Sequence, residues 1–258
     1  MQSADTLNTI ISDKDLVPRL EPYLPRLIPI LNECNIKIHI KLYFNFLLDF
    51  VKSYSDAIGE SVIPFVESLV TRIVIELKSC HEKGEKNNIV INKCWNVLRV
   101  ICESDSFMPR FAAQIENTMK PLFEYMADPS KVEFEDDIVL SVKSFLRKTG
   151  EVSPVMWTLY PYLQKVFDKN KHAFGNVLDT LNQYLVVARA QIAQSPDHMT
   201  LLVKMAGEAL FGMQPVITIH NAEGAILLQL LLQTYAGTPA LDPYYEEIMN
   251  LVRRRMVA

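Results

Sequence analysis

Two runs of apolar residues at helical spacing lie within residues 132–167. The first run, over 138–146, places its apolar side chains on one face and ends before Gly150. Ser153 and Pro154 then supply an N-cap hydroxyl and a ring that fits the first turn of a helix, and a second apolar run follows. The pattern predicts a helical hairpin. Each helix is apolar over more surface than one partner helix covers, so further hairpins are expected to flank it.

Prolines recur along the chain at a nearly constant interval. The spacings are 42, 45, 45, 42 and 47 residues, between Pro22, Pro64, Pro109, Pro154, Pro196 and Pro243. Repeats of the HEAT and armadillo type have units of about 40 to 47 residues. The sequence therefore predicts an all-α fold, an α-solenoid of about five to six antiparallel HEAT-repeat helix pairs over residues 1–258. The proline-marked helices are expected to line one face.

The remaining elements follow from apolar stripes of the same period. They comprise short runs at 6–11 and 23–31, and helices over about 40–51, 61–80, 91–102, 109–126, 177–188, 195–210, 226–235 and 242–252. The helix over 61–80 is apolar on two faces, as expected of a helix that packs both on its partner and on the next repeat. The polar residues 81–88 predict a loop, and Pro121 predicts a bend in its helix.

Composition and charge narrow the partners that this chain could bind. Hydrophobic residues make up 49% of the chain, with eight glycines and no useful alternating apolar and polar runs, which favours helices throughout. A net charge of −4 argues against direct binding of nucleic acid. Arg253, Arg254 and Arg255 form the one basic cluster. Because they fall in the last turn of a predicted helix, we interpret them as favourable to its dipole.

Cysteines and apolar runs indicate the compartment. Cys34, Cys80, Cys94 and Cys102 lack the spacing of a zinc site, and a helical chain of this length needs no disulfides, so a reducing compartment is expected. The N-terminus lacks the pattern of a signal peptide, and no run of 18 apolar residues predicts a membrane span. We expect an intracellular chain that does not bind or cross a membrane.

Sequence motifs for catalysis are missing. The chain contains no P-loop, dinucleotide fingerprint, HExxH or Gly-x-Ser-x-Gly elbow. The five histidines are scattered, and none pairs with a carboxylate or a cysteine at ligand spacing. We therefore expect no enzyme, no metal and no cofactor.

An acidic cluster is the candidate partner-binding site. It consists of Glu133, Glu135, Asp136 and Asp137, ahead of the helix that ends before Gly150. These carboxylates could attract a basic partner. Alternatively, they stabilise the positive end of the helix dipole, and the sequence favours this second interpretation.

The aromatic residues in the predicted helices are candidates for a binding platform or for the core. Trp157 and Tyr160 lie in one helix, and Tyr244 and Tyr245 lie near the start of another. At helical spacing between repeats, we expect them to be core residues. Truncating Trp157 to alanine should then cost about 3 to 5 kcal/mol.

One segment carries a family resemblance. Residues 152–157, Val-Ser-Pro-Val-Met-Trp, followed by Leu159 and Pro161, resemble a helix start in the importin-β superfamily of nuclear transport receptors. The segment resembles most the importin-seven and importin-eight branch, in which a similar Val-Ser-Pro-x-Met-Trp helix start follows an acidic helix. The order of helices and loops over about 51–210 is also similar.

The resemblance implies a receptor of roughly twenty HEAT repeats of this length class. Such a receptor binds protein cargo on its concave face, Ran GTPase chiefly through its N-terminal repeats, and phenylalanine-glycine nucleoporins on its outer face. It moves between cytoplasm and nucleus and passes the nuclear envelope in transit. The present chain would correspond to later repeats only, contributing cargo-binding surface and weak nucleoporin contact.

The apolar residues near both ends, over 7–11 and 248–252, predict a fragment of a longer receptor that associates with itself through its open ends. A HEAT-repeat scaffold of another assembly, such as a phosphatase or trafficking complex, is the alternative function. Periodicity alone does not separate the two.

Overall fold

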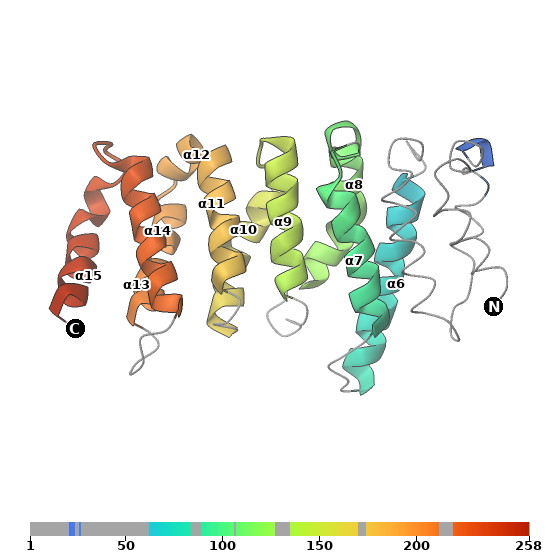
Figure 1. Cartoon of the computed structure of the whole chain (residues 1–258), viewed down its shortest axis with the longest axis horizontal. Helices are drawn as coiled ribbons and strands as arrows, with labels where there is room; N and C mark the ends of the chain where they lie inside the picture. The colour runs from blue at the N-terminus through green and yellow to red at the C-terminus, as the bar shows by residue number, and fades with distance from the viewer. Residues whose placement is uncertain are drawn as a thin grey trace. The chain divides into compact units, whose positions relative to one another are not determined.

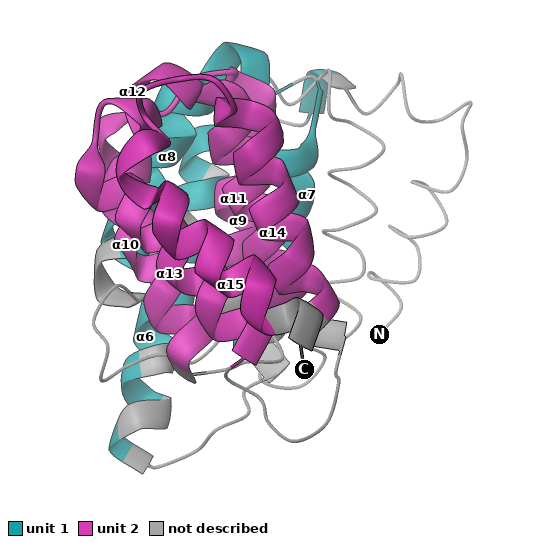
Figure 2. Ribbon diagram, turned by 90° about the vertical axis from the view of Figure 1, so that its left-hand side faces the viewer, with its two compact units in different colours: residues 1–133 teal, residues 134–258 magenta. Residues whose placement is uncertain are grey.

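A computed structural model of the chain describes residues 21–23, 26, 62–83, 89–105, 107–126, 135–169, 174–211 and 219–257. Every regular element in these ranges is an α-helix or a 3-10 helix, which confirms the predicted all-α fold (Figure 1). The chain divides into two compact units, unit 1 over 1–133 and unit 2 over 134–258 (Figure 2). Apart from the short 3-10 turn η1 (Glu21–Tyr23), the helices predicted before residue 60 lie outside the described residues.

Three long helices follow η1 in the described part of unit 1. They are α6 (Val62–Lys83), α7 (Ile89–Glu103) and α8 (Met108–Met126), and α6 packs against both of the others. Their contact buries Ile73, Trp95 and Phe123 almost completely. Between α7 and α8, the Ser104 hydroxyl accepts a hydrogen bond of 3.3 Å from the Phe107 backbone N–H, which caps the start of α8.

One sequence expectation for unit 1 needs revision. Residues 81–83 belong to α6, which ends at Lys83, rather than to the predicted loop over 81–88. Polar residues favour a loop there, but Glu and Lys are also good helix formers and extend an existing helix. Pro121 lies inside α8, and the bend that the sequence predicts at this residue stays a prediction.

Unit 2 contains three stacked helical hairpins in its described part. Its elements are α9 (Glu135–Thr149), α10 (Pro154–Lys169), α11 (Phe174–Val187), α12 (Arg189–Ala193), α13 (Pro196–Phe211), α14 (Ile219–Tyr235), η5 (Asp242–Tyr244) and α15 (Tyr245–Val257). One layer holds α9, α11 and α14, with α11 between the other two; α10, α13 and α15 stack in the same way (Figure 1). The proline-marked helices of this unit thus share one layer, as predicted. The apolar pattern of the sequence does not predict the five-residue helix α12.

Local capping signals in unit 2 act as the sequence predicted. Gly150 has a φ of 68°, in the left-handed region that ends helices, and its N–H bonds to the carbonyl of Leu146. The Ser153 hydroxyl accepts the N–H of Met156 at 3.1 Å, and the Ser195 hydroxyl accepts the N–H of His198 at 3.4 Å. Each serine therefore satisfies one donor that a helix start leaves unpaired.

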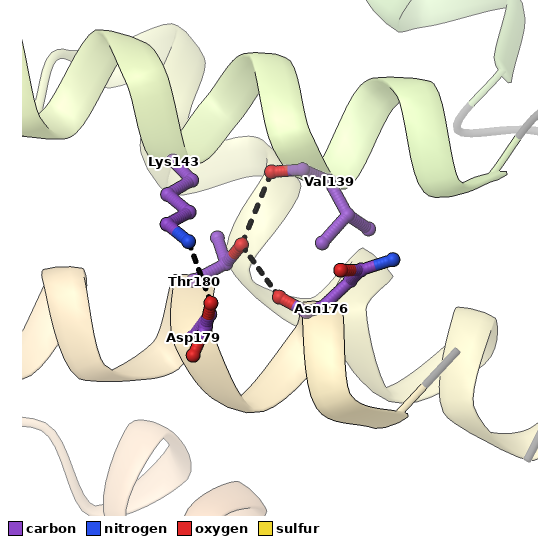
Figure 3. A network of polar contacts seen from close by, with 5 residues as sticks. All are labelled: Val139, Lys143, Asn176, Asp179 and Thr180. Atoms are coloured by element: carbon purple, nitrogen blue, oxygen red, sulfur yellow. Dashed lines mark hydrogen bonds and ion pairs between the residues drawn. The ribbon is translucent and has the colours of Figure 1, made fainter. Parts of the chain in front are cut away.

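A polar network joins α9 to α11 (Figure 3). The Lys143 ammonium lies 2.6 Å from the carboxylate of Asp179. Beside this pair, the buried Thr180 hydroxyl lies 3.1 Å from the Val139 carbonyl on α9 and 2.9 Å from the Asn176 carbonyl on its own helix, and it shares its proton between them. Because Thr180 is fully buried, this bond fixes the position of α11 along α9 more firmly than the exposed ion pair does.

Replacing Thr180 with valine is expected to lower the free energy of unfolding of unit 2 by about 1 kcal/mol, since the interhelical hydrogen bond is lost while the shape is kept. Hydrogen exchange of the α9 and α11 amides in a urea series measures this. Thr158→Val is the matched control, because the exposed Thr158 hydroxyl bonds only to Val155 in its own helix. Equal losses in the two variants would contradict a role for Thr180 between helices.

Candidate functional site

The acidic cluster predicted from the sequence lies at the start of α9. Glu135 is the first residue of the helix, and Asp136 and Asp137 follow in its first turn. Glu133 lies outside the described residues, and so do the side chains of the other three. Their backbone position fits carboxylates that stabilise the helix dipole. Binding of a basic partner to this cluster stays a prediction.

A groove between α6 and α8 is the second candidate site, and the sequence did not predict it. Its volume is about 640 Å³. The lining side chains come from one face of each helix: Glu67, Val70, Thr71, Val74, Ile75 and Lys78 from α6, and Asn117, Thr118 and Pro121 from α8. A groove of this size is in the range of natural ligand sites, which are concave and mostly apolar with a few polar groups.

The groove combines a closed apolar floor with an open apolar wall. Val70 is buried, whereas Ile75 is 57% exposed and Pro121 is also exposed. The second apolar face of the helix over 61–80 was the signal in the sequence that could have located this surface. Periodicity alone indicates that this face is apolar and does not show which part of it stays open.

The third candidate is a cluster of aromatic rings in unit 2. The Trp157 ring stacks on the His198 ring with centroids 4.7 Å apart and an interplanar angle of 1°. Tyr160 and Tyr184 meet edge to face at 4.9 Å, and Trp157 contacts both. The rings come from α10, α11 and α13, so they connect neighbouring hairpins.

Hydrogen bonds from tyrosine hydroxyls lock these rings in place. Tyr184 donates to the Met156 carbonyl, and Tyr160 donates to the His198 carbonyl at 3.2 Å. Burial raises the pKa of Tyr160 well above its usual value, with smaller contributions from the neighbouring hydroxyls of Tyr235 and Tyr184. The Tyr160 hydroxyl therefore keeps its proton around neutral pH and stays a hydrogen-bond donor. This arrangement serves packing rather than catalysis.

The structure corrects two aromatic expectations. Trp157 lies between hairpins, as predicted, but its indole is half-buried rather than fully buried. Tyr245 is 59% exposed and is no core residue, whereas the hydroxyl of its neighbour Tyr244 donates to the Pro196 carbonyl at 2.8 Å. Helical spacing does not distinguish the two tyrosines. Tyr244 is the last residue of η5 and Tyr245 is the first residue of α15, so their side chains lie in different surroundings.

The described cysteines are buried and lack the character of nucleophiles. Burial raises the pKa of Cys94 and that of Cys102 to about 12, with Arg72 partly opposing the shift at Cys94. The Cys102 thiol points to the Met119 sulfur at 3.8 Å. Only a thiolate reacts readily, so neither residue is a candidate catalytic group.

The substitutions Cys34→Ser and Cys80→Ser leave Cys94 and Cys102 as the two thiols of the chain. Near pH 8, a thiol reagent is expected to label them about a thousandfold more slowly in the folded chain than in concentrated urea. The reason is that a pKa raised from 9.0 to about 12 leaves about a thousandth of the thiolate. The raised pKa values also predict stability that is full below pH 9 and is lost as the pH rises from about 9 towards 12, where only the unfolded thiols ionise. Fast labelling of the folded chain would contradict this burial.

The residues that the structure describes give no support to a metal site, a catalytic histidine or a membrane span. Among them, no group of three or more His, Cys, Asp and Glu side chains is arranged to hold a metal ion. Of the five histidines, only the side chain of His198 is described, and it is engaged in the stack with Trp157. The described helices include none with the length and apolar character needed to cross a membrane.

Comparison with known proteins gives one distant relative. No family model matches the chain, and no solved structure matches it. The chain is 20% identical over 226 residues to Importin-8 of Mus musculus. The match covers 79% of this chain and 22% of Importin-8, so the chain spans about a fifth of that protein.

At 20% identity, this match is too distant to assign the chain to a family. The stacked hairpins of unit 2 and the match to Importin-8 together support one statement: the chain is an all-α protein of HEAT-like repeats with a distant similarity to Importin-8.

Proposed function

We propose that this chain is part of a nuclear transport receptor that carries protein cargo between cytoplasm and nucleus under control of Ran GTPase. The observation that supports this most directly is the similarity to Importin-8 over 79% of the chain. The chain would act by binding rather than by catalysis, with its helix pairs forming an extended surface for cargo.

Each candidate site has a place in this function. The groove between α6 and α8 offers a surface for a segment of cargo, and the first turn of α9 offers a cluster of carboxylates for a basic partner. The aromatic cluster around Trp157 keeps neighbouring hairpins in register, so that the partner-binding surface of unit 2 has a fixed shape. Phenylalanine-glycine nucleoporins and Ran are the further expected partners.

The test is a binding assay against Ran loaded with GTP, with Ran loaded with GDP as the control, and against phenylalanine-glycine repeats. The complete polypeptide that carries these residues is expected to bind GTP-loaded Ran in preference to the GDP form. This chain alone is expected to bind it little or not at all. If the complete polypeptide bound neither Ran nor the repeats, the alternative of a HEAT-repeat scaffold for another assembly would be favoured.

A further inference from the structure

The groove between α6 and α8 has charged residues at its two extremes along α6. Glu67 and Lys78 are the first and last lining residues on this helix, and both are exposed. Eleven positions of an α-helix correspond to about 16 Å. The groove therefore presents a negative charge at one end, a positive charge at the other, and apolar side chains between them.

These two charges make no ion pair with another residue that the structure describes. On the same helix, Arg72 and Glu76 are paired at 3.0 Å. Glu67 and Lys78 are thus available for a partner, in a position where they would flank whatever occupies the groove.

The polar side chains of the groove favour an extended segment over a helix. A helix pairs its backbone groups within itself, whereas an extended strand leaves its N–H and C=O groups unpaired. Thr71 and Asn117 line the groove with side chains that can donate to or accept from these groups. The Thr118 hydroxyl donates to the Gln114 carbonyl of its own helix and can still accept a hydrogen bond.

We propose that this groove binds an extended segment of a protein partner, with apolar side chains against Val74, Ile75 and Pro121, a basic residue at Glu67 and an acidic residue at Lys78. At about 3.3 Å per residue, the two charges of the segment lie about five positions apart. The inference rests on the proposed function only in that the chain binds protein partners, and it names the chemistry of the partner segment.

Three capped peptides test the charge pattern. Each carries two leucines between charged residues five positions apart, and the charged pair is lysine with glutamate, two lysines or two glutamates. Fluorescence anisotropy of the labelled peptides measures their affinities for the whole chain. The mixed peptide is expected to bind about two- to fivefold more tightly than either of the others, as exposed ion pairs typically contribute.

Charge reversal on the protein should change the preference. Glu67→Lys is expected to make the peptide with two glutamates the tightest ligand, and Lys78→Glu is expected to make the peptide with two lysines the tightest. Both residues are exposed, so neither change should disturb the fold. An unchanged order of affinities in the three proteins would overturn the proposal.

Removing the open apolar wall tests the site itself. Ile75→Ser is expected to weaken all three peptides by about five- to tenfold, because part of an isoleucine side chain is no longer buried on binding. Val186→Ser is the matched control, since Val186 is 70% exposed and lies in unit 2, outside the groove. Equal effects of the two variants would overturn the proposal.

Sedimentation of the Ile75→Ser variant and of the unchanged chain tests whether a second copy of the chain occupies the groove. If the chain formed dimers that this variant abolished, and no peptide bound, the groove would be a self-association surface and the proposal would fail. The Ran assay uses none of these peptides, so a failed transport function and a failed groove assignment give separate results.

Discussion

Replacing Gly224 with leucine is expected to separate α13 from α14 and to lower the free energy of unfolding of unit 2 by about 3 kcal/mol or more. A Cβ atom at this position would lie 2.8 Å from the backbone nitrogen of Leu210, 2.9 Å from the Cβ of Ala209 and 3.1 Å from the carbonyl oxygen of Ala206. Two of these atoms are backbone atoms, which no change of rotamer can move aside. The two helices approach this closely only because residue 224 has no side chain.

A graded series separates the clash from the change in helix propensity. Alanine favours a helix interior by about 1 kcal/mol over glycine, which partly offsets its own clash, so Gly224→Ala should cost only about 1 kcal/mol. Ala225→Leu is the control, because Ala225 is exposed on the same turn of α14. Hydrogen exchange of the α13 and α14 amides in a urea series gives the values. If Gly224→Leu were as stable as Ala225→Leu, the close packing of these helices would be wrong.

Truncating Trp157 to alanine is expected to cost about 3 kcal/mol, the lower end of the range for large aromatic residues. The half-buried indole loses less apolar contact than a fully buried one. It nevertheless holds three rings together, with centroid distances of 4.7 Å to His198, 5.7 Å to Tyr184 and 5.8 Å to Tyr160. Its removal should therefore loosen the contact among α10, α11 and α13.

The urea midpoint of Trp157→Ala, followed by circular dichroism, measures this cost. Trp157→Phe keeps a ring in the cluster and should lose about 1 kcal/mol, as volume-reducing aromatic exchanges with retained packing do. His198→Ala removes the stack on Trp157 together with the ring contact to Tyr160, and each such ring pair is worth about 0.5 to 1.5 kcal/mol. Full stability of Trp157→Ala together with loss of partner binding would show that the indole serves recognition rather than packing.

The acidic cluster and the groove show how far the sequence reached towards the candidate sites. Glu135 was recognised because a helix start has a local signature, namely carboxylates ahead of an apolar run. The groove was not recognised, because its walls come from Val74 and Pro121, which belong to different helices. The distance between two helices depends on all the side chains packed between them, and no single stretch of sequence contains that information.

The long helices of unit 2, their order and the serine caps of α10 and α13 could be predicted from the sequence alone. Periodicity, serine caps and the stop at Gly150 depend on interactions within a few residues, so they can be recognised locally. Tertiary structure alone decided which apolar surfaces close and which stay open. The contact at Gly224, the bond from Thr180 to α9 and the partial exposure of Trp157 arise where two helices meet. Such contacts depend on the separation and rotation of both helices, which are set jointly by the packing of the whole unit.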